Sequence, residues 1–143
     1  MEIDKIDLEI INILKEKGRI SHESIAKQIN LSRPAIRNRI KVLEQKGIIS
    51  GYTANIDYCK LGYPIQVLIY LKLNDTTYSD IMEHLNAIEF SDIYKFSHYR
   101  VSGEWCILLK ILSKSQGSLT KYLDLIQEID GIVATNTVFL FNS

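Results

Sequence analysis

Residues Ser21–Gly47 read S-H-E-S-I-A-K-Q-I-N-L-S-R-P-A-I-R-N-R-I-K-V-L-E-Q-K-G, and this stretch decides the fold of the first part of the chain. It predicts two short helices joined by a tight turn. Ser21 and Ser32 each stand where a helix would begin, and a hydroxyl there accepts a hydrogen bond from an otherwise unpaired backbone N–H. Asn30 lies between the helices and tolerates the left-handed conformation that a sharp turn needs.

The apolar residues of this stretch recur at three- and four-residue spacing, which predicts that they pack the two helices together. They are Ile25, Ala26, Ile29, Leu31, Ile36, Ile40 and Leu43. The same spacing leaves Arg33, Pro34, Arg37, Asn38 and Lys41 on the outer face of the second helix. Guanidinium and amide groups on one helix face can read base edges and bind phosphates in a major groove, so the sequence indicates a DNA-binding protein.

Each residue of this face has an expected role. Arg33, Arg37 and Asn38 are predicted to contact base edges or the groove, whereas Lys27 and Lys41 are predicted to neutralise phosphates. Pro34 falls in the first helical turn, where its missing N–H costs nothing. The predicted DNA-binding set is Lys27, Ser32, Arg33, Pro34, Arg37, Asn38 and Lys41.

Arg39 has a different expected environment from the other cations. It stands next to Ile40, nearer the packed side, and is predicted to form an ion pair with Glu44 or to reach a phosphate. The alternative for any one of these cations is an ordinary solvated position. Their concentration on one helix favours the nucleic-acid interpretation.

The charge of the chain is divided unevenly between its two parts. The 143 residues contain 17 Lys/Arg and 17 Asp/Glu, so the formal net charge is zero. Residues 1–50 hold 10 Lys/Arg against 7 Asp/Glu, and the remainder holds 7 against 10. A positive end would orient the molecule on a polyanion while the acidic end stays away from it.

The cysteine, histidine and hydropathy patterns argue against a metalloprotein and against a membrane-spanning or exported protein. Cys59 and Cys106 form no C-x-x-C pair, and His22, His84 and His98 are scattered, so no metal or cofactor site is expected. No apolar stretch reaches membrane-spanning length, and no N-terminal targeting pattern is present. We therefore expect a cytoplasmic protein in a reducing setting.

The segments around the helical pair complete a first domain over residues 1–57. A helix is predicted from Asp4 to Lys17, with Gly18 ending it. After Gly47, the run I-I-S-G-Y-T-A-N-I-D predicts a short β ribbon that turns at Ser50-Gly51. Three helices and a ribbon predict a winged helix-turn-helix, and residues 58–64, with Gly62 and Pro64, predict a hinge.

Residues 65–143 predict a second domain of the α+β class. Strands are expected at 65–73, 93–101, 105–112 and 133–141, and helices at 79–88 and 118–129. The side chains of the second helix that are predicted to face the core are Tyr122, Leu125, Ile126 and Ile129. The order β-α-β-β-α-β predicts a ferredoxin-like fold, in which two helices cover one face of an antiparallel sheet. The other face would carry Leu68, Tyr70, Cys106, Leu108 and Leu112. Solvated sheet faces are more polar than this, so the sequence predicts a homodimer formed through that face.

Several motifs along the whole chain resemble the Lrp/AsnC (leucine-responsive/asparagine-responsive, feast/famine) family of transcriptional regulators. They are I-D-K-I-D-L-E-I-I-N-I-L at 3–14, L-S-R-P-A-I-R-N-R-I-K-V-L-E-Q-K-G-I-I at 31–49, G-Y-T-A at 51–54, L-G-Y at 61–63, V-S-G-E-W at 101–105 and D-G-I-V-A-T-N-T at 130–137. The resemblance implies a double-stranded DNA partner, dimers that assemble further into octamers, and a small effector such as an amino acid bound between dimers.

The resemblance also implies where the effector binds. The family builds this site from the loop between the second and third strands of the second domain. On this chain the loop corresponds to Tyr99, Arg100, Val101, Ser102, Gly103 and Glu104, with Thr135 and Thr137 on the last strand nearby. Arg100 is the expected partner of a carboxylate, because a guanidinium can bind it through two hydrogen bonds.

One position departs from the family pattern, because Cys106 stands where the family's loop commonly has an aspartate. A thiol at its ordinary pKa does not supply the negative charge that an ammonium group needs. Two functions therefore remain open: an effector-responsive regulator, and an architectural DNA-organising protein without an effector. No catalytic arrangement is found, so an enzyme is not expected.

Overall fold

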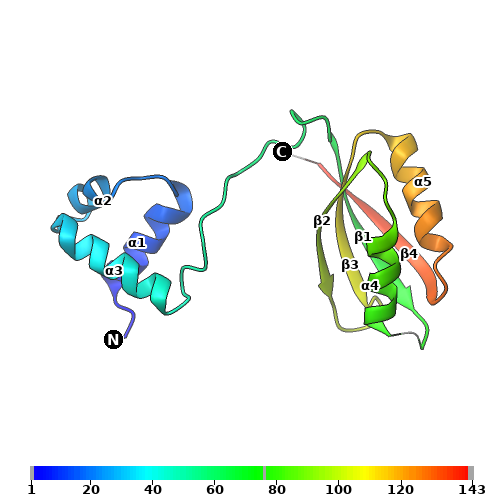
Figure 1. Ribbon diagram of the computed structural model, residues 1–143, viewed down its shortest axis with the longest axis horizontal. Coiled ribbons are helices and arrows are strands. Elements are labelled where there is room, and N and C mark those ends of the chain that lie inside the picture. Colours follow the sequence, from blue (N-terminus) through cyan, green and yellow to red (C-terminus); the bar gives the residue numbers. More distant parts are fainter. Residues whose placement is uncertain (1, 76, 142–143) are drawn as a thin grey trace. The chain divides into compact units, whose positions relative to one another are not determined.

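Serine and aspartate side chains begin the three helices of the first unit, α1 (Lys5–Glu16), α2 (His22–Gln28) and α3 (Arg33–Gln45). Ser21 Oγ accepts from Ser24 N at 3.1 Å, and Ser32 Oγ accepts from Ala35 N at 3.3 Å, which confirms both predicted caps. Asn30 has the predicted positive φ, 56°. The predicted apolar stripe of α2 and α3 forms one core with Ile10 of α1. The helix-turn-helix therefore folds as the sequence predicts (Figure 1).

The computed structural model describes residues 2–75 and 77–141. The chain divides into two compact units, one ending at Asn55 and the other beginning at Ile56. No helix within the described residues combines the length and the apolar character that crossing a membrane requires.

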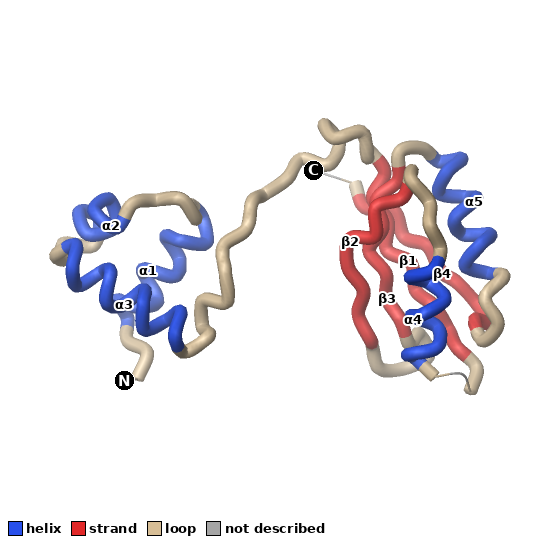
Figure 2. The backbone as a smooth tube through the Cα atoms, in the orientation of Figure 1, coloured by secondary structure: helices blue, strands red, loops and turns tan. Residues whose placement is uncertain are grey.

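The predicted β ribbon after α3 is wrong. Residues 48–57 form no strand and run as an extended connection (Figure 2). The N–H groups of Ile48 and Ile49 donate back to the carbonyl of Leu43, so these two residues complete the end of α3. Residues 50–57 are exposed, and a two-stranded ribbon without a packed face has little stability of its own.

A buried ion pair joins α1 to α3. The side chain of Asp7 is fully buried, and Nη1 of Arg39 donates to its Oδ1 and to Oδ2 of Asp4, each at 2.8 Å. Asp4 and Asp7 also bind each other's backbone N–H groups at 2.9 and 3.1 Å, which forms a capping box. Arg39 thus fixes the start of α1 against α3; its predicted pairing with Glu44 is wrong, since Tyr52 donates to Glu44 instead.

This network makes the first unit sensitive to acid. The backbone N–H of Asp7, and then the Arg39 guanidinium, hold the pKa of Asp4 below its ordinary 3.8. A depressed folded-state pKa contributes stability that is complete above the unfolded-state pKa and is lost as the pH falls through the folded-state value. We therefore expect circular dichroism at 222 nm to show the first unit losing stability below about pH 4. The loss should be shallower in Asp4→Asn, and an equal loss in both proteins would contradict this assignment.

The second unit is a four-stranded antiparallel sheet with two helices. In chain order it contains β1 (Ile65–Leu73), α4 (Tyr78–Ala87), β2 (Ile93–Arg100), β3 (Ile107–Ser113), α5 (Gln116–Gln127) and β4 (Ile132–Leu140). The strand order is β2-β3-β1-β4, and every pair is antiparallel, which confirms the predicted ferredoxin-like arrangement. α4 and α5 pack over one face of the sheet (Figure 1).

Alternation along the strands gives the sheet one buried face and one face without helices. Val67, Ile69 and Leu71 of β1 are fully buried beneath the helices. Leu125 of α5 is 37% exposed, so its predicted inward position is wrong; α5 turns Leu119, Tyr122 and Ile126 to the core. The sequence alone does not show which face of α5 points to the core, because both faces carry leucines. The packing of α5 against the sheet selects the face.

Aromatic rings from residues 58–64 pack against the helix-free face at one end of the sheet. This segment forms a turn, and its Tyr58 lies 5.3 Å from the ring of Tyr94 and 5.4 Å from that of Phe96. Tyr63 lies 6.0 Å from Tyr94. Leu112, the cross-strand partner of Tyr94, is fully buried although it lies outside the helix-side core. This end of the face is therefore partly covered within the chain, with Tyr94 44% and Phe96 42% exposed.

Candidate nucleic-acid interface

α3 presents a polar outer face because its apolar side chains are buried in the core. Ile36, Ile40 and Leu43 are between 0% and 3% exposed. The intervening positions point outward and leave Arg33, Pro34, Arg37, Asn38 and Lys41 exposed to solvent. Ser32 caps the helix, and Pro34 occupies its first turn. Both stabilise the N-terminal end of α3, where Arg33 lies.

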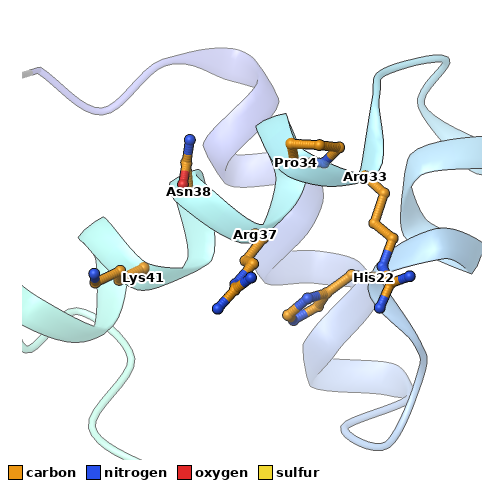
Figure 3. Close-up of a pocket in the computed structure, with 6 residues that line it drawn as sticks. All are labelled: His22, Arg33, Pro34, Arg37, Asn38 and Lys41. Atoms are coloured by element: carbon orange, nitrogen blue, oxygen red, sulfur yellow. The ribbon is translucent and has the colours of Figure 1, made fainter.

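These side chains line one open hollow of about 630 Å³ together with His22. Figure 3 shows the imidazole of His22 close to the guanidinium groups of Arg33 and Arg37, with Lys41 further along α3. His22 is the first residue of α2 and is half-buried. The hollow brings three cations and an imidazole together, and phosphate oxygens and base acceptors are the groups that match such donors.

Sequence reasoning missed His22. The spacing of the three histidines excludes a shared metal site but does not predict a role in DNA binding. The available signal was its place directly after the cap Ser21: the first turn of α2 lies against the start of α3 in a helix-turn-helix, so its side chain joins the outer face of α3.

The two remaining predicted residues have other partners in the structure. Lys27 forms an i,i+4 ion pair with Glu23 at 2.9 Å on α2, and it does not line the hollow beside Arg37. The Lys27 hydrogen bond lowers the pKa of Glu23, and the charge of Arg33 lowers it further. Ser32 uses its hydroxyl for the cap of α3.

The predicted effector loop connects β2 to β3. Gly103 has φ 106°, a conformation that other residues rarely adopt, so this glycine is required by the turn. Glu104 accepts from Lys72 Nζ at 2.6 Å, and this contact lowers the pKa of Glu104. The Arg100 guanidinium lies 5.6 Å from the centre of the Tyr78 ring. The acidic group of the loop thus forms a solvent-exposed ion pair with a lysine of β1.

Thr135 and Thr137 lie on β4, and β1 separates them from β3 and its loop. They are the cross-strand partners of Leu71 and Ile69, so they share the helix-covered face. Thr135 Oγ1 accepts from Gln127 Nε2 of α5 at 3.2 Å. Within one chain, the two threonines and the loop 99–104 therefore form separate groups.

Cys106 lies beside the predicted effector loop, with its Sγ 4.0 Å from the carbonyl oxygen of Gly103 and 3.9 Å from that of Glu104. Its backbone N–H donates to the carbonyl of Leu71 at 2.9 Å, and its side chain packs against the core of the second unit. Within residues 2–75 and 77–141, no three His, Cys, Asp or Glu side chains gather closely enough to hold a metal ion.

Two protein families match this chain. Residues 3–50 match the family described as winged helix-turn-helix DNA-binding, and residues 66–143 match the Lrp/AsnC ligand binding domain. An uncharacterized HTH-type transcriptional regulator of Pyrococcus furiosus is 34% identical over 96% of this chain and 90% of its own length. LrpC of Bacillus subtilis, an HTH-type transcriptional regulator, is 32% identical over 87% of this chain and 83% of its own.

Solved structures share the whole architecture. The structure of Bacillus subtilis LrpC has a TM-score of 0.83 and 29% identity, and the match covers 100% of this chain and 97% of that one. A transcriptional regulator from Neisseria meningitidis, solved as an L-methionine complex, has a TM-score of 0.85. That match covers 99% of this chain and 91% of the other, and at 20% identity it shows the fold alone.

Proposed function

The chain belongs to the Lrp/AsnC family of DNA-binding transcriptional regulators, and we propose that it reads specific operator sequences through the outer face of α3, as a homodimer responsive to a small effector. The observation that carries this proposal is the hollow in which Arg33, Arg37, Asn38 and Lys41 join His22. The relatives are transcriptional regulators, so we propose no catalytic activity for this chain and a cytoplasmic location beside the DNA.

The proposed binding mode places α3 in the major groove. Arg33 and Arg37 would contact guanine edges through paired N–H donors, and Asn38 would contact adenine. Lys41 lies at one end of the hollow, and His22 lies between Arg33 and Arg37; both would bind phosphates (Figure 3). Selection of duplexes from a random library tests this proposal: enrichment of one sequence is expected, and uniform retention of all sequences would contradict specific reading.

The helix-free face of the sheet supports a dimer. Leu68, Tyr70 and Leu108 are only partly covered within the chain, and Val138 is 41% exposed. These residues occupy neighbouring positions on β1, β3 and β4, as the strand register requires. The same face also carries Lys110 opposite Leu68 and Asn136 opposite Tyr70, so it is an apolar patch with polar neighbours, and pairing with a second copy would bury the patch on both sides. We propose octamers as the further assembly.

Two substitutions on β4 test the dimer. Val138→Asp would place a carboxylate in the proposed interface, where desolvation without a partner is costly, so we expect dissociation to rise at least about tenfold. Val133→Asp is the matched control: the same residue type, 56% exposed, but beside Gln127 of α5. Sedimentation equilibrium measures both. Equal effects of the two substitutions, or no effect of either, would reject this interface.

Effector control is proposed for the loop 99–104, with Arg100 as the partner of a carboxylate and Thr135 and Thr137 approaching from another dimer. The match of residues 66–143 to the Lrp/AsnC ligand binding domain supports a small ligand, and we propose an amino acid, the ligand class of the Neisseria regulator of the same fold. Such a ligand acts by binding one assembly more tightly than another.

An architectural protein without an effector is the second candidate. The exposed ion pair between Glu104 and Lys72 favours it, because Lys72 competes with an ammonium group for the one carboxylate of the loop. Light scattering with a panel of amino acids separates the two functions. A shift in mass with one amino acid supports the regulator, whereas tight DNA binding with constant mass supports the architectural protein.

A further inference from the structure

His22 lines two neighbouring hollows of the first unit. It lines the larger hollow, of about 630 Å³, with Arg33 and Arg37, and a second hollow of about 320 Å³ with Ser21 and Glu23. Arg33 also lines both hollows. Figure 3 shows the imidazole between the two guanidinium groups of α3. The ring therefore lies where the first turn of α2 meets the outer face of α3.

Both ring nitrogens of His22 are available to a bound group. The side chain is half-buried, and within residues 2–75 and 77–141 it has no hydrogen-bond partner. His84 differs, because its Nδ1 lies 2.7 Å from the carbonyl oxygen of Asp80. A charged imidazole has two N–H donors and no acceptor, so it matches an anion better than the neutral ring does.

The other charges that face His22 are fixed at neutral pH. On α3 they are the cations of the larger hollow, Arg33, Arg37 and Lys41. On α2 the facing group is Glu23, and its hydrogen bond from Lys27 holds the pKa of that carboxylate below its ordinary 4.5. Arginine and lysine side chains titrate far above neutral pH. Among the described side chains that line the two hollows, only the imidazole is of a type that changes charge between about pH 5 and 8.

We propose that DNA binding by this chain takes up a proton on His22, whose charged imidazole donates to a phosphate oxygen in the complex. This inference rests on the proposed function, since it requires duplex DNA in the larger hollow. A phosphate brought against the ring favours its charged form, because opposite charges attract strongly where water is displaced. The hydrogen bond that results joins two charged groups and is stronger than one made by a neutral ring.

The proton sets the direction of the pH dependence. The complex binds more protons than the separate protein and DNA, so the affinity is greatest at low pH. It falls as the pH rises through the range in which histidine titrates. Arg33, Arg37 and Glu23 keep their charges over this range and add no pH dependence. We expect the affinity of the full-length protein for duplex DNA to fall about tenfold between about pH 6 and pH 8.

Two measurements on the full-length protein test the inference. Fluorescence anisotropy with a labelled duplex of mixed sequence gives the affinity at each pH. A mixed sequence is sufficient because a phosphate contact carries no sequence information. The ionic strength is held constant, since phosphate contacts depend on salt. Isothermal calorimetry in two buffers of unlike ionisation enthalpy gives the number of protons taken up, and we expect net uptake near neutral pH.

Three variants separate the charge of His22 from its shape and its position. His22→Gln should bind at low pH as weakly as wild type binds at high pH, and should take up no proton at this site. His22→Lys carries a fixed positive charge, so it should bind tightly at both ends of the pH range. His98→Gln, the matched control, removes an exposed histidine of the second unit and should keep the wild-type pH dependence. Circular dichroism at 222 nm confirms that each variant is folded.

The outcomes distinguish this inference from the function on which it rests. DNA binding without net proton uptake, or a pH dependence that survives in His22→Gln, would overturn the inference and leave the proposed function in place. If His22→Gln does not fold, pH-dependent binding by His22→Lys would overturn it in the same way. Absence of binding to any duplex at low pH would reject the proposed function and the inference together.

Discussion

Replacing Arg39 with alanine is expected to lower the free energy of unfolding of the first unit by about 3 kcal/mol. The substitution leaves Asp7 with its side chain fully buried and its charge unpaired. Removing one partner of a buried pair exposes the full desolvation cost of the other, which is why the loss is large. Arg39 itself is 25% exposed, so water reaches this pair from one side and the lower part of the usual range applies.

The reverse substitution should cost less. Asp7→Asn keeps the shape of the side chain. The Arg39 guanidinium still contacts solvent and still forms its ion pair with the carboxylate of Asp4. We expect the double variant Arg39→Ala/Asp7→Asn to be more stable than Arg39→Ala alone, because it no longer buries an unpaired charge. Glu23→Ala, which breaks the exposed pair with Lys27, is the control and should leave the free energy of unfolding nearly unchanged.

The two units can be observed separately in these experiments. Trp105 is the single tryptophan and belongs to the second unit, so its fluorescence reports that unit. Circular dichroism at 222 nm also follows the three helices of the first unit. Urea denaturation of Arg39→Ala should shift the dichroism transition and leave the Trp105 transition in place. A parallel shift of both signals, or a cost no larger than that of Glu23→Ala, would contradict the assignment.

Replacing Arg37 with alanine should weaken binding to the selected operator by about 1–3 kcal/mol per subunit. Arg37 lies at the centre of the hollow on α3, its side chain is exposed, and the core does not depend on it (Figure 3). The loss should concentrate on one base position, since a guanidinium that reads a base edge carries sequence information.

Two other substitutions serve as comparisons for Arg37→Ala. Arg19→Ala removes the same charge from an exposed position outside α3 and should change affinity far less. Lys41→Ala should weaken all sequences alike and lower the slope of affinity against salt by about one. Fluorescence anisotropy at fixed salt measures all three variants. If Arg37→Ala matches Arg19→Ala on the operator, Arg37 does not read a base.

Local patterns predicted most of the secondary structure correctly. The caps Ser21 and Ser32, the turn at Asn30 and the order of strands and helices all depend on interactions within a few residues of the chain. The exception among local features is the ribbon after α3. Its residues have the right composition, but Ile48 and Ile49 complete the helix end, and residues 50–57 stay exposed and form no strand.

The helix-turn-helix, the ferredoxin-like order and the family could be predicted from the sequence, because periodicity, capping and motif spacing are local features of the chain. The charge partners follow from tertiary packing instead: Arg39 with Asp7, Lys72 with Glu104, and His22 beside Arg37. These residues are far apart in sequence, and long side chains reach several alternatives. Which contact forms depends on the packing of whole helices and strands, and burial then sets the strength of each charge interaction.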